Sequence, residues 1–236
     1  MGDSVHAALD PIFDFDRIYT FEPVENLAQK LRCIKNNRLT VVQAGLFDTT
    51  CKKTIYHAGT LAGSIYADAP RHLEDGVESA CGFIEASQFF RENIKNEDVV
   101  YMKLNCEGSE CSILENLLDS GEIQKVTEVL IDFDALKIPS QRNRVDDLLQ
   151  RIQASRISYH TPEQVQYGMI NNYGAIRNWL LVTGAAHANA ATKILSALYQ
   201  LKIMLTKQYN GYYKMRVLNK MPMLKRVVNK LRGRAA

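Results

Sequence analysis

The sequence lacks any apolar run approaching the roughly 18 residues that a membrane-spanning helix requires. With only 13 Gly and 6 Pro among 236 residues, a collagenous or low-complexity chain is excluded. The residues after Met1 contain no basic segment followed by a long apolar one, so nothing there would act as an export signal. We therefore expect a globular protein of the cytoplasm, large enough to bury a full core.

Cysteines are few and scattered, and their number is odd. No two of them have the two-residue separation of a zinc knuckle, and five cysteines do not form a disulfide framework. We predict reduced thiols that pack as small hydrophobic groups, at Cys33, Cys51, Cys81, Cys106 and Cys111.

Acidic residues are absent after Glu163. Residues 164–236 contain 12 Lys and Arg and no Asp or Glu, whereas residues 1–163 contain 17 basic and 26 acidic residues. This asymmetry favours an anionic partner for the basic tail, such as a membrane surface, nucleic acid or an acidic glycan. The alternative is a tail that folds back on the acidic body.

Short apolar runs alternate with helical stretches from Arg17 to about Thr183, which is typical of an α/β sheet built from crossover units. The pattern predicts strands over 17–22, 39–44, 99–105, 126–133 and 178–183, helices over 24–36, 86–94, 109–120 and 142–155, and a β-hairpin over 51–66. We place a domain boundary after Gly184, which gives domains of residues 1–184 and 185–236.

The segment after Gly184 contains two amphipathic helical patterns. The first comprises Ile194, Leu198, Leu201 and Leu205, and the second comprises Leu224, Val227, Val228 and Leu231. We expect the first to pack in a core. The second, with the tyrosines at 209–213 and its basic face, predicts peripheral membrane contact through residues 209–236. Nucleic acid is the less favoured partner because the tail has no groove-reading motif.

Ligands of open α/β sheets bind at the carboxyl ends of the strands. The first predicted strand ends at Glu22, whose ionised carboxylate could accept hydrogen bonds from ribose hydroxyls. Gly2 and Asp3 lie 20 residues earlier, close to the usual spacing between a glycine-rich turn and its ribose-binding acid. Alternatively, Glu22 followed by Pro23 is a device that starts the next helix.

A more specific pattern covers residues 103–110 (KLNCEGSE). Strand alternation places Lys103 and Asn105 on one face, and Gly108 permits a sharp turn into the next helix, whose first turn includes Glu110. Two carboxylates and an amide thus converge at one corner. The alternative is that Glu107 and Glu110 only complement the helix dipole.

The strand over 126–133 leads into a third polar pair. Asp132 and Asp134 share a face where this strand ends. A surface turn before Pro139 would also explain them.

Three segments carry a resemblance to a known family: YTFEP (19–23), VVQAGLFD (41–48) and MKLNCEGSE (102–110). In order and spacing they resemble the successive motifs of the FkbM family of S-adenosylmethionine-dependent methyltransferases, over roughly residues 2–183. The resemblance implies a Rossmann-like, doubly wound class I sheet with helices on both faces, and S-adenosyl-L-methionine across the strand ends. Members typically methylate hydroxyl oxygens of glycans or secondary metabolites.

The resemblance also implies roles for individual residues. Gly2 and Asp3 match the end of the cofactor loop, Glu22 would bind the ribose, Leu46, Phe47 and Asp48 would line the adenine side, and Asn105 with Glu107 would face the methyl group and the acceptor. For the proton acceptor of the reaction, our candidates are Glu107 and Asp134.

The chain departs from the family in two places. Family members usually have aspartate where this chain has Asn105. The first strand and most of the glycine-rich loop have no counterpart, so we expect an incomplete copy whose missing strand would lie between the strands that end at Glu22 and Asn105. Two strands without that neighbour would each lose backbone hydrogen bonds, at about 1 to 3 kcal/mol for each unpaired buried group.

Two other functions compete with an O-methyltransferase. A nicotinamide-dependent oxidoreductase is disfavoured because the sequence has no complete Gly-x-Gly-x-x-Gly loop. The other is a noncatalytic or truncated methyltransferase-like module, which would bind an anionic membrane or another anionic partner through its basic tail.

Overall fold

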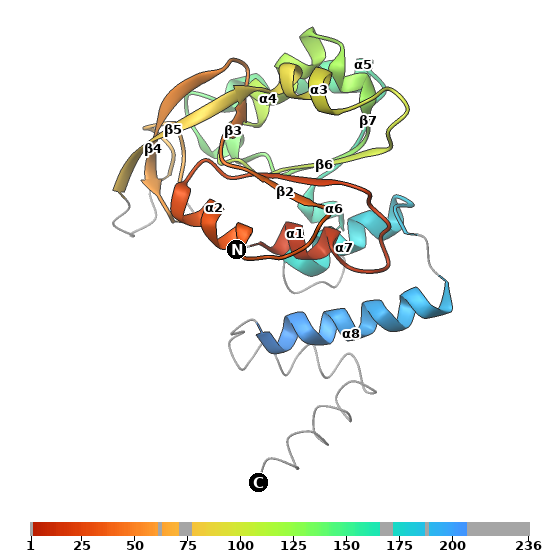
Figure 1. The fold of residues 1–236 in the computed structure, drawn as a ribbon. Coiled ribbons are helices and arrows are strands. Elements are labelled where there is room, and N and C mark those ends of the chain that lie inside the picture. Colours follow the sequence, from red (N-terminus) through yellow and green to blue (C-terminus); the bar gives the residue numbers. More distant parts are fainter. Residues whose placement is uncertain (1, 61–62, 71–76, 166–171, 187–188, 207–236) are drawn as a thin grey trace. The chain divides into compact units, whose positions relative to one another are not determined.

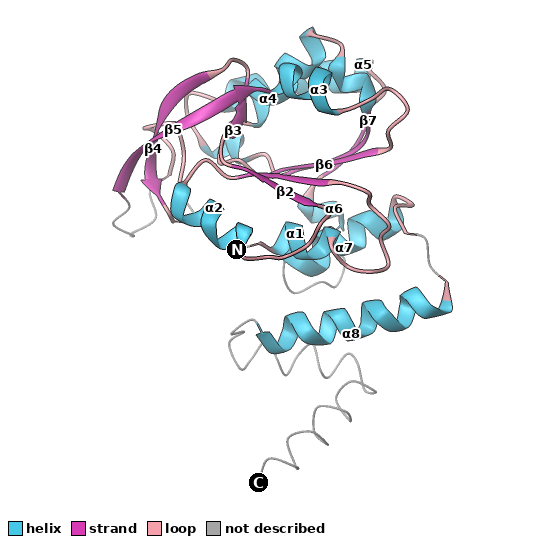
Figure 2. Cartoon of the chain, viewed as in Figure 1, coloured by secondary structure: helices cyan, strands magenta, loops and turns pink. Residues whose placement is uncertain are grey.

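The computed structural model describes residues 2–60, 63–70, 77–165, 172–186 and 189–206 (Figure 1). These residues form eight α-helices and three small sheets that contain parallel strands, so the predicted mixed α/β class is confirmed (Figure 2). The chain divides into two compact units: a sheet unit, Asp16–Val165, and a helical unit, Met1–Phe15 with Gln166–Ala236. The predicted domains, 1–184 and 185–236, stay a prediction, since compactness alone does not show that a part folds by itself.

The first sheet of the sheet unit is a parallel pair. Strand β1 (Ile18–Phe21) lies beside β2 (Leu39–Val42), and helix α2 (Glu25–Arg32) connects them. The apolar residues of α2 recur at helical spacing, and three of them are buried: Leu27, Ala28 and Leu31. The predicted strand, helix and strand over 17–44 are confirmed, with shorter bounds.

The second sheet has the order β3-β5-β4, with β3 at Gly45–Phe47, β4 at Cys51–Ala58 and β5 at Val77–Glu85. The predicted hairpin over 51–66 is wrong in its partner, because β4 pairs antiparallel with β5. Between 53–57 and 63–66 the structure records an isolated bridge, Tyr56 to Ser64. The longer pairing prevails because it buries Ile55 of β4 against Phe83 of β5 in a shared core.

The third sheet is parallel, in the order β6 (Val100–Leu104), β7 (Val126–Ile131) and β8 (Ser158–His160). Helix α4 (Glu110–Asp119) and the 3-10 helix η1 (Glu122–Lys125) connect β6 to β7, and η2 (Asp134–Lys137), η3 (Arg142–Arg144) and α5 (Val145–Ala154) connect β7 to β8. Helix α3 (Ala86–Asn93) precedes β6, and α6 (Pro162–Val165) follows β8. The predicted helices over 86–94, 109–120 and 142–155 are thereby confirmed.

One core joins this sheet to its helices. It includes Met102 and Leu104 of β6, Val129 and Ile131 of β7, and Leu114 of α4, all less than 9% exposed. Helix α4 packs against both α3 and α5 (Figure 1). Such burial is the main stabilising contribution of the unit.

In the described residues, β1 and β6 belong to different sheets, each paired along one edge, with β2 and β7 respectively. The expectation of one continuous doubly wound sheet is therefore not met in this part of the chain. These are the two strands that the resemblance placed on either side of a missing strand.

The helical unit contains α1 (Asp3–Ala8), α7 (Asn172–Val182) and α8 (Ala190–Thr206). The predicted strand over 178–183 is wrong, because this segment is the end of α7. Its buried residues follow a helical period: Tyr173, Ile176, Trp179 and Leu180. Taken alone, the short apolar run NWLLVT is typical of a strand. Together with the residues before it, it continues the helical pattern of α7.

A buried ion pair holds the helical unit together. Asp10 is fully buried, and its carboxylate accepts hydrogen bonds from Arg177 Nε at 2.7 Å and from the Tyr173 hydroxyl at 3.3 Å. The Arg177 guanidinium also donates to Ser196 Oγ of α8 at 2.9 Å. Charge-assisted bonds of this kind compensate for the burial of the charges.

Several sequence predictions concern the tail. The second amphipathic pattern (224–231) and the tyrosines at 209–213 lie outside the described residues. Of the helices that are described, none has the length and apolar character needed to cross a bilayer. All five cysteines are free thiols, as predicted, but only Cys81 and Cys111 are buried. The predicted packing as a small hydrophobic group is wrong for Cys33, which is exposed.

Candidate active site

The corner predicted at residues 103–110 is a tight turn between β6 and α4. Glu107 and Gly108 both have left-handed backbone conformations, with φ of 51° and 106°. A Cβ atom on Gly108 would collide with the Ile138 side chain and lie 3.0 Å from the Tyr66 ring. Glycine is therefore required at residue 108, both for its positive φ and because a Cβ atom has no room. The predicted sharp turn is confirmed.

Asn105 lies at the centre of the polar cluster that follows. Lys103 Nζ donates a hydrogen bond to Asn105 Oδ1 at 3.0 Å, which confirms that the two residues share a face. Because an ammonium group can only donate, it fixes the amide with its oxygen toward Lys103 and its NH₂ group away from it. That NH₂ group lies 3.4 Å from Glu107 Oε1 and 3.4 Å from Asp134 Oδ2. The structure thus brings together the three predicted catalytic residues.

The electrostatics of the cluster single out Glu107. Burial, and after it the carboxylates of Asp134 and Glu110, raise the pKa of Glu107 from 4.5 to about 7. Burial and the neighbouring Asp134 also raise the pKa of Asp132. A half-buried carboxyl group that titrates near neutrality is suited to accept a proton.

Asp134 has a different environment. It is only 6% exposed, so the surface turn considered for it is wrong, and it forms an ion pair with Lys137. The hydrogen bond that Lys137 donates to Asp134 raises the pKa of Lys137. Burial lowers the pKa of Lys103 on the other side of the cluster. Lys137 was not predicted from the sequence, although its spacing of three residues from Asp134 on a helical turn was a usable signal.

Glu110 has a structural role that the sequence analysis did not identify. Its side chain is fully buried at the start of α4. One carboxylate oxygen accepts hydrogen bonds from the backbone N–H groups of Cys106 (3.1 Å) and Gly108 (3.2 Å), and the other accepts one from Ala135 (3.3 Å). Glu110 therefore connects the turn after β6 to the turn after β7. A residue that merely complemented the helix dipole would make none of these three bonds.

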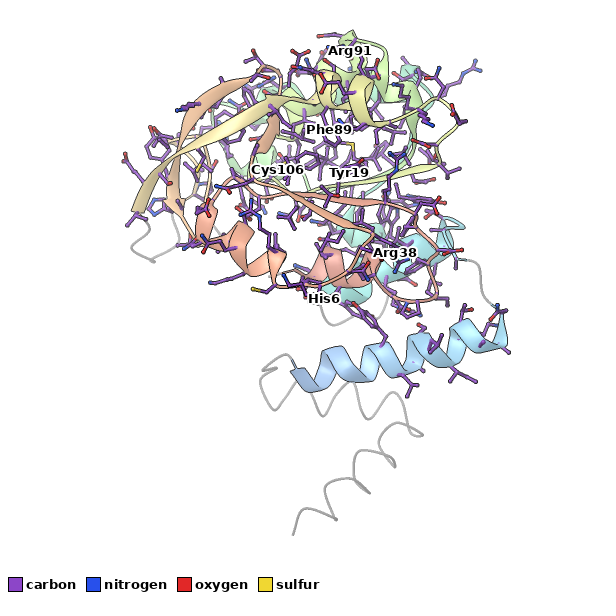
Figure 3. The ribbon with its side chains drawn as sticks, viewed as in Figure 1. His6, Tyr19, Arg38, Phe89, Arg91 and Cys106 are labelled. Carbon is purple, nitrogen blue, oxygen red and sulfur yellow. The ribbon has the colours of Figure 1, made fainter. Side chains whose placement is uncertain are left out.

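The segment over 63–70 contacts the same two turns. Ser64 Oγ donates to the backbone carbonyl of Glu107 at 2.6 Å, and Ser140 donates to the Asp68 carboxylate from its backbone N–H (2.8 Å) and its hydroxyl (3.0 Å). Figure 3 labels Cys106 in the turn that Ser64 contacts. No local sequence signal links residues 43 positions apart, so these contacts follow only from the tertiary structure.

The predicted ribose-binding acid, Glu22, follows β1. Its Oε1 accepts a hydrogen bond from the Val24 backbone N–H at 2.9 Å, which fixes the turn that leads into α2, although no side chain among the described residues caps the helix itself. Burial raises the pKa of Glu22, and the bond from Val24 opposes this shift. The described residues provide no hydrogen bond to its second oxygen, which leaves one acceptor for a ligand hydroxyl.

The residues predicted to line the adenine side lie on and after β3. Leu46 and Phe47 are buried in the cores, so their backbone rather than their side chains could contact a ligand. Asp48 is exposed, and its backbone carbonyl accepts a hydrogen bond from Asn116 Nδ2 at 3.0 Å. Their cofactor roles stay a prediction.

Gly2 and Asp3 belong to the helical unit. Gly2 has a left-handed conformation (φ 76°) and precedes α1, and Asp3 is the first residue of that helix. The left-handed conformation is compatible with the end of a glycine-rich turn. Their cofactor role also stays a prediction.

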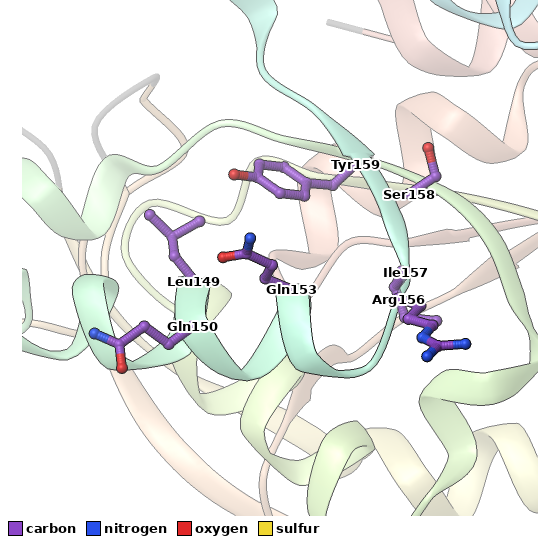
Figure 4. Close-up of a pocket in the computed structure, with 7 residues that line it drawn as sticks. All are labelled: Leu149, Gln150, Gln153, Arg156, Ile157, Ser158 and Tyr159. Carbon is purple, nitrogen blue, oxygen red and sulfur yellow. The ribbon is translucent and has the colours of Figure 1, made fainter.

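Two hollows on the surface lie apart from this cluster. One is formed by α5 and β8 and is lined by residues that include Leu149, Gln153 and Tyr159 (Figure 4). The other is lined by Asn96 and residues of the 120–125 turn. Neither includes a predicted site residue. In the described part of the chain, no group of three or more His, Cys, Asp or Glu side chains could hold a metal ion.

Comparison with protein-family models, with curated proteins and with solved structures finds no match to this chain. The resemblance to the FkbM family therefore rests on the three sequence motifs alone.

Proposed function

We propose that this protein is an O-methyltransferase that transfers a methyl group from S-adenosyl-L-methionine to a hydroxyl of a glycan or secondary metabolite. The observation that supports this most is the cluster at the ends of β6 and β7, where Asn105 lies within hydrogen-bond distance of Glu107 and Asp134. The cluster lies at the carboxyl ends of parallel strands, where α/β proteins bind their ligands.

Methyl transfer to a hydroxyl needs a proton acceptor and precise alignment. Glu107 is the better acceptor, because its pKa of about 7 lets it be ionised at neutral pH and still hold the proton that it receives. Asp134 is buried and paired with Lys137, which makes it less accessible to an acceptor hydroxyl.

Asn105 then has a positioning role. Its amide orientation is fixed by Lys103, and its NH₂ group faces the two carboxylates. An aspartate, which the family usually has at this position, could accept the hydrogen bond from Lys103 but could not donate to the two carboxylates. Asparagine makes all three bonds and removes one negative charge. The proton-accepting role therefore falls to Glu107 rather than to residue 105.

The residues present fit S-adenosylmethionine at one point that can be tested. The second carboxylate oxygen of Glu22 is available for a ribose hydroxyl, while its first oxygen is held by Val24. The cofactor supplies an electrophilic methyl group, and the chain supplies orientation and a site for the hydroxyl proton. Asp48, on the adenine side, is exposed and could contact the base.

One observation favours the noncatalytic alternative. In the described residues β1 and β6 lie in separate sheets, so Glu22 and Asn105 are at the ends of strands that no common sheet fixes. A binding module that retains the methyltransferase motifs without turnover would have this architecture as well.

Calorimetric titration with S-adenosylhomocysteine separates these functions. We expect the wild type to bind, the Glu22→Ala variant to bind at least about tenfold more weakly because a ribose hydrogen bond to a charged group is lost, and the exposed control Glu97→Ala to bind as the wild type. Glu107→Gln should retain binding and lose methyl transfer in a screen of glycan acceptors. Absence of binding by the wild type would remove the methyltransferase assignment, and full activity of Glu107→Gln would remove Glu107 as the base.

A further inference from the structure

Helix α8 packs with its polar side toward the rest of the helical unit. Ser196 is 1% exposed and accepts a hydrogen bond from the Arg177 guanidinium at 2.9 Å. One turn further along, the Tyr199 hydroxyl lies 3.2 Å from His6 Nδ1 of α1; Figure 3 labels His6 on that helix. Among the described side chains of α8, Ser196 and Tyr199 contact the rest of the helical unit through their hydroxyl groups.

The opposite side of α8 is apolar and exposed. Ile194, Leu195 and Leu198 are 64%, 52% and 58% exposed. With about 100° of rotation per residue, Ile194 and Leu198 lie about 40° apart, and Ser196 lies about 160° from each of them. The sequence prediction of core packing is thus wrong for Ile194 and Leu198, because this part of the helix faces the unit with its hydroxyl groups instead. The side chains of the other two residues of that pattern, Leu201 and Leu205, lie outside the described part of the structure.

Exposed aliphatic side chains in a row are unfavourable in water and mark a contact surface. The charge of this part of the chain indicates what covers it. Helix α8 contains two Lys and no Asp or Glu, and no acidic residue occurs anywhere in 164–236. Lys193 is exposed, but it lies about 100° from Ile194 and only about 60° from Ser196, so it flanks the buried side of the helix rather than the apolar row. Attraction to anionic groups therefore comes from the basic composition of residues 164–236 as a whole.

We propose that the exposed face of α8, formed by Ile194, Leu195 and Leu198, docks on a bilayer surface that carries anionic headgroups. The helix lies in the plane of the interface with its apolar row in the acyl boundary, and the excess of basic residues in 164–236 favours anionic headgroups. A second copy of the chain is the weaker occupant, because pairing through this face would bring two strongly basic segments together.

This surface differs from the one predicted from the sequence, which was residues 209–236. It also does not depend on the proposed methyltransferase function. The apolar contribution is assigned to three residues that the structure describes, so it can be tested without altering any charge.

The test uses the full chain and co-sedimentation with vesicles of phosphatidylcholine alone and of phosphatidylcholine mixed with phosphatidylglycerol. The double substitution Ile194→Gln with Leu198→Gln should lower the partition coefficient on the anionic vesicles by at least about tenfold, because two aliphatic side chains no longer leave water. Val99→Gln, at a residue that is 68% exposed in the sheet unit, is the matched control and should bind as the wild type. The unfolding midpoint of all variants should stay unchanged, since the residues are exposed.

Three results would overturn the proposal. Equal vesicle binding by the wild type and the double variant would show that α8 does not contribute. No binding of the wild type to anionic vesicles would show that the surface is not a lipid contact. A wild type that is dimeric in the absence of lipid, and a double variant that is monomeric, would assign this face to a second copy of the chain.

Discussion

Replacing Glu110 with alanine removes one acceptor group from three backbone N–H donors at once. Those of Gly108 and Ala135 belong to buried residues, and that of Cys106 to a half-buried one. A buried donor left without a partner costs about 1 to 3 kcal/mol, and removal of the buried carboxylate itself returns part of this. We therefore expect Glu110→Ala to lower the free energy of unfolding by about 2 to 4 kcal/mol.

The conservative change Glu110→Gln removes fewer of these hydrogen bonds. An amide can keep its oxygen toward Cys106 and Gly108, but its NH₂ group then faces the N–H donor of Ala135, so one of the three bonds is lost. We expect a loss of about 1 to 2 kcal/mol, smaller than that of the alanine variant. The same variants should lower the pKa of Glu107, because the Glu110 charge that helps to raise it is gone.

Urea unfolding monitored by circular dichroism measures the stabilities, and carboxyl NMR titration measures the pKa. The exposed Glu97→Ala variant is the control and should lie within about 0.5 kcal/mol of the wild type. A loss below about 1 kcal/mol for Glu110→Ala, or a larger loss for glutamine than for alanine, would refute the three-bond role of Glu110.

Other substitutions test the remaining parts of the structure. Gly108→Ala should destabilise by at least about 2 kcal/mol in urea unfolding, because the new Cβ has no room and φ is positive, whereas Gly82→Ala, which meets nothing within 4 Å, should change little. Asp10→Ala should cost about 3 kcal/mol in the same assay by leaving the Arg177 charge without its buried partner, and adding Arg177→Met should recover part of that loss. The pKa of Glu107 is raised from 4.5 to about 7 on folding, so the folded state binds this proton more tightly and the associated stability is lost as pH rises through that interval. Between about pH 5 and about pH 8 the wild type should therefore lose more unfolding free energy than Glu107→Gln, and equal pH profiles would contradict the shift.

The local sequence pattern was sufficient to predict those strands and helices whose hydrophobic periodicity extends over several residues and ends at a turn signal. The strands at 18–21, 39–42, 100–104 and 126–131 and the helices between them were predicted within a few residues. Period and turn chemistry act over neighbouring residues, so they can be read without knowing the fold. Strand β5 was missed because its residues alternate weakly, and its partner β4 is separated from it by a long segment.

In the candidate site, too, some features were predictable from the local sequence and others depend on the tertiary structure. Strand alternation predicted that Lys103 and Asn105 share a face, the family resemblance pointed to Glu107, and the end of the strand over 126–133 pointed to Asp134. That the pKa of Glu107 is near neutrality depends on burial and on the carboxylate of Asp134 from another turn, neither of which a local pattern contains, and further on Glu110 of the same corner.

The sequence by itself determined the α/β class, most of the strands and helices of the sheet unit, and the corner that carries Asn105 and Glu107. These depend on the alternation of apolar and polar residues and on glycine, which are properties of neighbouring residues. The tertiary structure alone decided that Glu110 bonds to two separate turns and that α8 turns its hydroxyl groups inward and leaves Ile194 and Leu198 exposed. An amphipathic pattern defines two faces of a helix, but which face is buried depends on the partners that the rest of the fold presents to it.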